Sequence, residues 1–246
     1  ETQAGFLPSM VFLWFFILSV PTAMLMNRIG RKNTVLLSML FTFAGMVLPF
    51  IDFSETSCYV AFALLGIGNT ILQVSLNPLL ANVVQGKGLT SSLTAGQFVK
   101  AISSFVGPLL AGYCSAVLGN WALMFPIYAV VTLISSAWLF LTPIQREKVE
   151  GETSSFPATL KLLGDNKILF FGILCVVGLD VGMNTLTPKL LLERVPGIST
   201  ESAGYGTSWY FAARTIGTFC GAFLLAKLSE RGYFRINMII AMIAVC

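Results

Sequence analysis

Three charged side chains lie well inside apolar stretches of the sequence: Lys100, Asp180 and Arg214. If such stretches cross a membrane, a charge at the centre costs about 2.5–3.5 kcal/mol or more, so it usually faces a cavity or another charge. We hypothesise that Lys100 projects into a central cavity and pairs with Asp180 in at least one state, Asp180 being the leading titratable group. A static pair that serves only assembly is the alternative. For Arg214, a structural or gating role and a ligand contact stay open.

Amide side chains accompany these charges at helical spacing, because residues three, four or seven positions apart share one face of a helix. Three rows have this spacing: Asn69, Gln73 and Asn77; Gln97, Lys100 and Ser104; and Asp180 with Asn184. Polar rows on apolar helices are expected to face one another or water, never lipid. Together they predict a polar chamber whose donors and acceptors suit a polyhydroxylated solute. A bond to a neighbouring helix is the structural alternative for any single amide.

The composition indicates the elements that carry these rows. The chain has 246 residues, of which 56% are hydrophobic and 11% are charged, whereas soluble domains carry about 25% charged residues. Repeated apolar runs of about 20 residues have the length of membrane-spanning helices. The strands of membrane barrels would alternate instead. We therefore predict an all-α, multi-pass membrane protein.

Seven spans and part of an eighth are expected along the chain. Their predicted ranges are 6–26, 35–51, 58–84, 91–118, 121–142, 168–192 and 204–227, with a start from about 236. Basic residues gather on alternate connections, which the positive-inside rule places in the cytoplasm. These connections are 27–34, 85–90, 143–167 and 228–235.

The segment 143–167 is the long polar stretch of the chain and reads as a central loop between two membrane halves, 1–142 and 168–246. The stretches "AMLMNRIGRKNTVL" and "FLLAKLSERGYFRI" form a weak parallel repeat across it. The chain begins with Glu1 and stops within the apolar run "MIIAMIAVC". We therefore expect a piece of a longer protein.

Several kinds of chemistry are not expected. Histidine is absent, which removes the commonest zinc and copper ligand, and the five cysteines are scattered singly. Neither HExxH nor GxSxG occurs. We therefore expect no metal site, cofactor, catalytic residue or enzyme activity. The net charge is +4, and the basic residues that produce it gather in the connections between the spans. We therefore expect no nucleic-acid partner.

The stretch "NRIGRK" resembles the cytoplasmic signature of the major facilitator superfamily. That signature has a small residue, then an acidic residue four positions later, then basic residues around a glycine. Ala23 holds the small position, Asn27 replaces the acidic residue, and the basic residues and the glycine match. The expected cytoplasmic gate motif here comprises Asn27, Arg28, Gly30, Arg31 and Lys32. Because Asn27 carries no charge, the resemblance does not extend to the acidic partner of the gate.

The stretches "LGIGNTILQVSLNPLLANVV", "LTAGQFVKAISSFVGP" and "VVGLDVGMN" are similar to the fucose–galactose–hexose proton symporter family. The resemblance covers essentially the whole chain. It implies that 1–142 holds family helices 2–6 and that 168–246 holds helices 7–8 and the start of 9. The first helix and roughly the last three would then be missing. It also implies alternating access around a midplane site, and a monomer.

The resemblance carries over by residue. Gln73 stands where a fucose-transporting member has a glutamate used in proton coupling, and an amide cannot titrate. Gln97 matches a cavity amide, Lys100 falls on an asparagine, and Asp180 falls where relatives have Glu or Gln. Asp180 is therefore the proton-coupling candidate. The expected substrate-binding residues are Gln73, Asn77, Gln97, Lys100, Asp180 and Asn184.

The leading hypothesis is a secondary active transporter in the inner (cytoplasmic) membrane. It would move a monosaccharide, a hexose or 6-deoxyhexose such as fucose, glucose or galactose, with protons. Its partners would be the sugar, protons and the lipid bilayer. One alternative is an organic-anion or drug carrier in which Lys100 and Arg214 hold the anion. The other is a sugar sensor that binds without moving its ligand.

Overall fold

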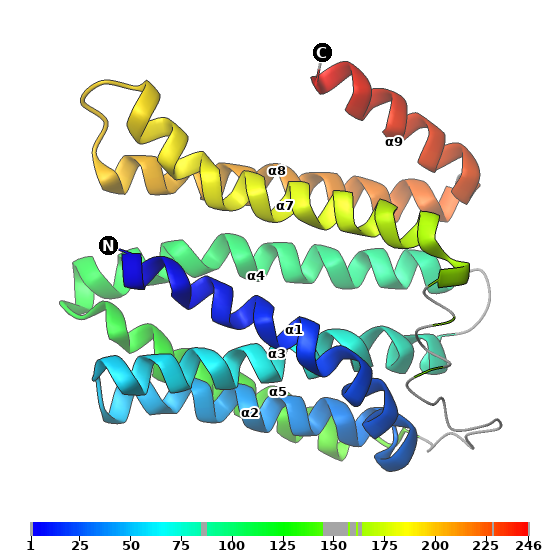
Figure 1. The fold of residues 1–246 in the computed structure, drawn as a ribbon, viewed down its shortest axis with the longest axis horizontal. Helices are drawn as coiled ribbons and strands as arrows, with labels where there is room; N and C mark the ends of the chain where they lie inside the picture. The colour runs from blue at the N-terminus through cyan, green and yellow to red at the C-terminus, as the bar shows by residue number, and fades with distance from the viewer. Residues whose placement is uncertain are drawn as a thin grey trace. The chain divides into compact units, whose positions relative to one another are not determined.

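The fold was analysed in a computed structural model, which describes residues 2–84, 88–144, 157, 161, 164–227 and 229–245. In these residues the regular structure is helical throughout (Figure 1). The elements are α1 (Thr2–Ile29), α2 (Arg31–Ile51), α3 (Glu55–Val83), α4 (Leu89–Leu118), η2 (Trp121–Leu123), α5 (Met124–Leu141), α7 (Lys167–Arg194), α8 (Thr200–Lys227) and α9 (Glu230–Val245).

The helices confirm the predicted all-α class, and each expected span coincides with a helix to within about six residues. Five helical stretches in the described part are long and apolar enough to cross a membrane. They are Arg31–Ile51, Glu55–Val83, Leu89–Leu118, Trp121–Leu141 and Lys167–Arg194.

The expected connections at 27–34 and 228–235 are wrong in extent. The break between α1 and α2 is the single residue Gly30, whose φ of 88° and ψ of 156° suit glycine almost alone. α9 already begins at Glu230. Arginine and lysine are good helix formers, so a basic segment need not interrupt a helix. Residues 85–87 and most of 143–167 lie outside the described residues.

The chain forms two compact units. The first comprises Glu1–Val83 and Leu110–Ile168, and the second comprises Val84–Leu109 and Leu169–Cys246. The predicted division into halves at the central loop stays a prediction. The first part of α4 belongs to the second unit, and its last part belongs to the first unit.

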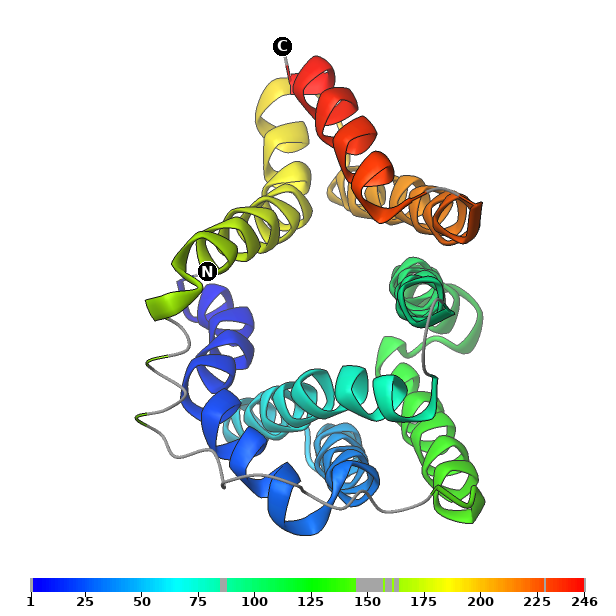
Figure 2. The ribbon, with the colours of Figure 1, turned by 90° about the vertical axis from the view of Figure 1, so that its right-hand side faces the viewer.

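In the first unit, α3 contacts α1 and α2, and α2 contacts α5 (Figures 1 and 2). Glycines allow these helices to approach closely. A Cβ added at Gly68 of α3 would lie 2.5 Å from Oγ1 of Thr42 and 2.9 Å from the carbonyl oxygen of Ser38. A Cβ added at Gly66 would lie 2.7 Å from Cδ1 of Trp14 in α1. Small residues at helix contacts are typical of membrane proteins.

In the second unit, α7 and α8 run in opposite directions and are joined by a short connection (Figure 1). They touch where Gly206 of α8 lies against Thr187 and Leu191 of α7. The first part of α4 contacts α8 through the rings of Phe98 and Phe219, whose centroids are 5.3 Å apart. These contacts position the charged residues of the candidate site.

Candidate functional site

An ion pair joins α7 to α8 within the second unit. Nη1 of Arg214 lies 2.6 Å and 2.7 Å from the two carboxylate oxygens of Asp180. The side chains are 29% and 33% exposed, respectively, so both are half-buried. Both helices are otherwise rich in apolar residues. Each charge therefore has a counter-ion in an apolar environment, where a single unpaired charge would be energetically costly.

Tyr210 also contacts Asp180, because its hydroxyl donates a hydrogen bond to the same carboxylate. Tyr210 and Arg214 are four residues apart and share one face of α8. Thr207 continues this face, and its hydroxyl donates to the backbone carbonyl of Asn184, 3.4 Å away. Sequence reasoning did not single out Thr207 and Tyr210. Their i, i+3, i+7 spacing with Arg214 was the signal that could have found them.

Lys100 of α4 lies close enough to Asp180 and Arg214 to interact electrostatically with both. Arg214 and not Lys100 is the ion-pair partner of Asp180 in this structure. The sequence hypothesis paired Asp180 with a different base, Lys100. Lys100 and Arg214 both lie in apolar runs of the sequence. Helical spacing within the segment of Asp180 does not show which of these two bases, each on another helix, lies beside it. A Lys100–Asp180 pair in another state stays a prediction.

The remaining amides of the second unit are Gln97 on α4 and Asn184 on α7. In the part of the chain that the structure describes, neither side-chain amide forms a hydrogen bond; Asn184 only accepts one on its backbone carbonyl. Gln97 is half-buried and adjoins Phe98, which contacts α8. The four predicted residues of this unit thus lie on two helices that both contact α8.

Gln73 and Asn77 lie on α3 in the first unit, one helical turn apart. Gln73 is half-buried and Asn77 is exposed. No hydrogen bond of either side chain is found among the described residues. A common chamber formed by these two residues and the residues of the second unit stays a prediction.

The basic residues of the gate motif hold helix ends together in the first unit. Arg31 donates to the carbonyl oxygen of Pro78 in the last turns of α3, over 2.8 Å. Lys32 donates to the carbonyl oxygens of Phe140 and Thr142 at the end of α5, over 2.9 Å and 2.7 Å. Because α5 ends at Leu141, Lys32 satisfies two of the last carbonyls of that helix and complements its dipole.

Gly30 supplies the break that brings these two bases to the start of α2. The other two residues of the motif, Asn27 and Arg28, end α1 one turn earlier, and both make further interactions. The predicted role of the motif as a cytoplasmic gate stays a prediction.

No three His, Cys, Asp or Glu side chains come together as metal ligands in the described ranges. The arrangement in the second unit consists instead of a carboxylate, two bases, a phenol and unbonded amides. Such groups can hold a proton, an anion or hydroxyl groups.

A helical membrane protein with charges and amides inside its spans fits a class of transporters, and the chain belongs to one. It is a member of the Major Facilitator Superfamily, whose family model matches residues 1–246. This superfamily consists of membrane transporters. The chain therefore belongs to a superfamily of transporters, and its long apolar helices indicate a multi-pass membrane protein.

Particular relatives are sugar transporters by name. The glucose/galactose transporters of Brucella abortus biovar 1 (strain 9-941) and of Brucella abortus (strain 2308) are each 23% identical to this chain. The match covers 98% of the chain and 63% of each relative, so the chain spans less than two thirds of their length.

A crystal structure of the E. coli fucose:proton symporter, FucP, has the same fold, with a TM-score of 0.81 and 18% identity. The match covers 98% of this chain and 68% of that chain. The superfamily resemblance drawn from the sequence is confirmed. The named relatives agree with the narrower resemblance to hexose and fucose symporters.

Proposed function

We propose that the chain is part of a secondary active transporter that moves a monosaccharide together with protons across the inner membrane. The substrate class is a hexose or 6-deoxyhexose. The observation that carries the proposal is the set of side-chain amides on apolar helices without a hydrogen bond in the described residues: Gln73, Asn77, Gln97 and Asn184.

These amides match the chemistry of a sugar. Each side-chain amide offers two donors and an acceptor, and each sugar hydroxyl needs both kinds of partner. An amide inside the membrane that bonds neither a neighbour nor water is costly, so a ligand or water has to satisfy it. The relatives named as glucose/galactose transporters and as a fucose:proton symporter support the same substrate class.

Asp180 is the candidate for proton coupling. Protonation would remove its charge and leave Arg214 without its counter-ion, because the guanidinium of arginine stays charged. The contact between α7 and α8 that the pair provides would then weaken. Proton binding and movement of these two helices would be linked in this way, which is what a symporter requires.

An organic-anion carrier is the second candidate, and Lys100 favours it. Arg214 is neutralised by Asp180, whereas Lys100 has no ion pair among the described residues. Together these three side chains carry one net positive charge. An anionic ligand would balance it.

The two candidates are separated by exchange transport in proteoliposomes. Vesicles that contain the full-length protein would be loaded with an unlabelled solute, and the entry of the labelled solute would be followed without an ion gradient. The panel would comprise glucose, galactose, fucose and a hexuronate. We expect exchange of at least one neutral sugar. Exchange of the hexuronate alone would replace the sugar proposal by the anion carrier.

A further inference from the structure

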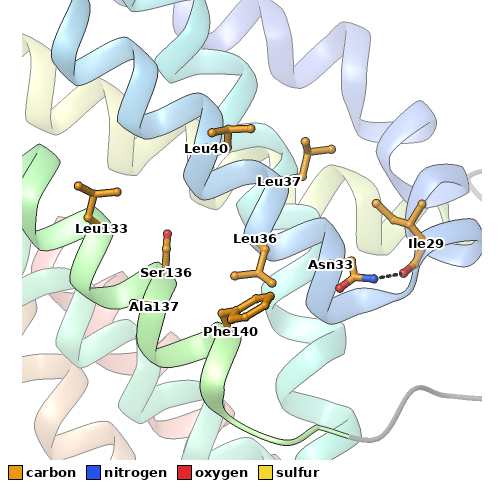
Figure 3. Close-up of a pocket in the computed structure, with 9 residues that line it drawn as sticks. All are labelled: Ile29, Asn33, Leu36, Leu37, Leu40, Leu133, Ser136, Ala137 and Phe140. Atoms are coloured by element: carbon orange, nitrogen blue, oxygen red, sulfur yellow. Dashed lines mark hydrogen bonds between the residues drawn. The ribbon is translucent and has the colours of Figure 1, made fainter.

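A groove with a volume of about 620 Å³ lies between α2 and α5 in the first unit (Figure 3). Leu36 and Leu40 of α2 and Leu133 and Phe140 of α5 form much of its apolar lining. Polar side chains enter at two points, Asn33 and Ser136. None of these residues belongs to the candidate sugar site.

The groove lies on the face of α2 that points away from α3. Ser38 and Thr42 face α3, where they lie against Gly68. At 100° per residue, Leu36 and Leu40 lie about 160° around the helix from Ser38. α3 therefore does not fill the groove, and Leu40 remains 62% exposed.

Both walls of the groove are membrane spans by length and composition. α2 covers Arg31–Ile51, and α5 together with η2 covers Trp121–Leu141. An apolar groove on the outer side of two such helices lies within the hydrocarbon region, where acyl chains are the available ligands. A volume of about 300–1,000 Å³ is typical of small-molecule sites.

A positive charge stands at one end of the groove. Lys32 adjoins Asn33, and its ammonium group lies 6.0 Å from the ring centroid of Phe140. Two carbonyl oxygens accept hydrogen bonds from this group, and an ammonium group has three donors. Arg28 is exposed one turn earlier. The basic residues predict that this end is cytoplasmic, where anionic phospholipids attract bases near the surface.

We propose that the groove between α2 and α5 binds an acyl chain of an anionic phospholipid, whose phosphate group accepts a hydrogen bond from Lys32. The apolar lining selects the chain, and the charge of Lys32 selects the headgroup. Lys32 already joins the ends of α2 and α5, so a bound phosphate would strengthen that junction.

Native mass spectrometry of the full-length protein tests the proposal. The protein would be released from nanodiscs that contain equal amounts of phosphatidylglycerol and phosphatidylcholine, and the retained lipid would be identified. Ala137→Phe fills the groove, and Lys32→Gln removes the charge. Ala44→Phe and Lys227→Gln are the matched controls. Ala44 is an exposed alanine of α2 outside the groove, and Lys227 is a helix-end lysine beside Phe223.

We expect one retained phosphatidylglycerol in the unsubstituted protein and in both controls. Lys32→Gln should weaken retention about fivefold, as expected for one base near an anionic headgroup. Lys32→Arg should preserve retention, and Ala137→Phe should abolish it. Equal retention of phosphatidylcholine, retention that persists in Ala137→Phe, or no retained lipid would overturn the proposal. The last result would mean that a protein segment covers the groove.

Discussion

Asp180 receives hydrogen bonds from two side chains of α8, Tyr210 and Arg214. These two side chains form three hydrogen bonds to one carboxylate, so the cluster connects two helices as well as pairing two charges. Removing one member of a buried pair leaves the other uncompensated, which costs about 3–5 kcal/mol when both are fully buried. The partial exposure of this pair lowers that cost.

Single and double substitutions of the pair should therefore differ. We expect Asp180→Asn to lower the thermal stability, because it leaves the charge of Arg214 without its partner. Asp180→Asn combined with Arg214→Gln should recover most of that stability. Both variants should lose proton-driven accumulation, because neither keeps the titratable group. Thermal unfolding in detergent and gradient-driven uptake would measure the two effects.

Gradient-driven accumulation that survives in the double variant would contradict the coupling role of Asp180. The Asp180–Arg214 pair would then contribute to the stability of the protein and not to proton coupling.

The amide of Asn77 gives a second test. We expect Asn77→Ala to raise the KM for the transported sugar about two- to tenfold, which is the range for one lost hydrogen bond. Asn82→Ala is the matched control on the same helix, outside the predicted row. Saturation curves for exchange would show the difference. An equal KM in both variants would make Asn77 a structural amide.

The sequence predicted the unusual residues of the site better than their partners. Lys100, Asp180 and Arg214 stand out because charges are rare in apolar segments. Which base meets Asp180 depends on how α4 and α8 lie against α7, and helical spacing within one segment carries no such information. Tyr210 was missed because an aromatic residue in a membrane helix is unremarkable until a carboxylate lies beside it.

At the scale of the elements, close helix packing depends on small residues. Gly68 of α3 lies against Ser38 and Thr42 of α2 with no space for a methyl group. We expect Gly68→Ala to lower the free energy of unfolding by about 1–3 kcal/mol, the usual cost of overpacking.

Gly112→Ala is the matched control for this prediction. Gly112 lies within α4, and a Cβ added there meets nothing within 4 Å. Because alanine favours helix over glycine by about 0.8–1.0 kcal/mol, this control should not destabilise the protein. Thermal unfolding of the two variants in the same detergent tests the contrast. Equal stabilities would show that α2 and α3 can separate without loss.

The break at Gly30 gives another prediction for the elements. Its φ of 88° and ψ of 156° fall in a region that residues with a Cβ avoid, at a cost of about 1–3 kcal/mol. We expect Gly30→Ala to destabilise the junction of Arg31 and Lys32 with the ends of α3 and α5. Faster proteolysis at this junction, compared with Gly112→Ala, would be the readout. Unchanged proteolysis would contradict the structural role of the break.

The spans were predictable because apolar runs of about 20 residues have one stable form in a membrane. The short breaks between α1 and α2 and between α8 and α9 were not. A basic segment can continue a helix as easily as interrupt it. The charges in 27–34 and 228–235 therefore indicated where the connections lie but not how many residues each connection has. The single φ of Gly30 decided the first break.

At the scale of the whole molecule, the superfamily fold predicts alternating access, in which a site opens to one side of the membrane at a time. The first part of α4 belongs to the same compact unit as α8, where Ser91 donates to the carbonyl oxygen of Ala222 over 3.2 Å. Contacts of this kind have to change if α4 and α8 move apart during a transport cycle.

The energy available for coupling is adequate. One charge that crosses 100 mV releases about 2.3 kcal/mol, which corresponds to a concentration ratio of nearly fiftyfold. A single proton per sugar is therefore sufficient for marked accumulation.

The most direct measurement is the uptake of labelled hexoses and 6-deoxyhexoses by proteoliposomes that contain the full-length protein, with and without an inward proton gradient. We expect one or more of these sugars to accumulate above the external concentration only when the gradient is present. Equilibration of a sugar to the same level with and without the gradient would contradict proton coupling. Failure of every sugar to enter would contradict the proposal that the protein transports a monosaccharide.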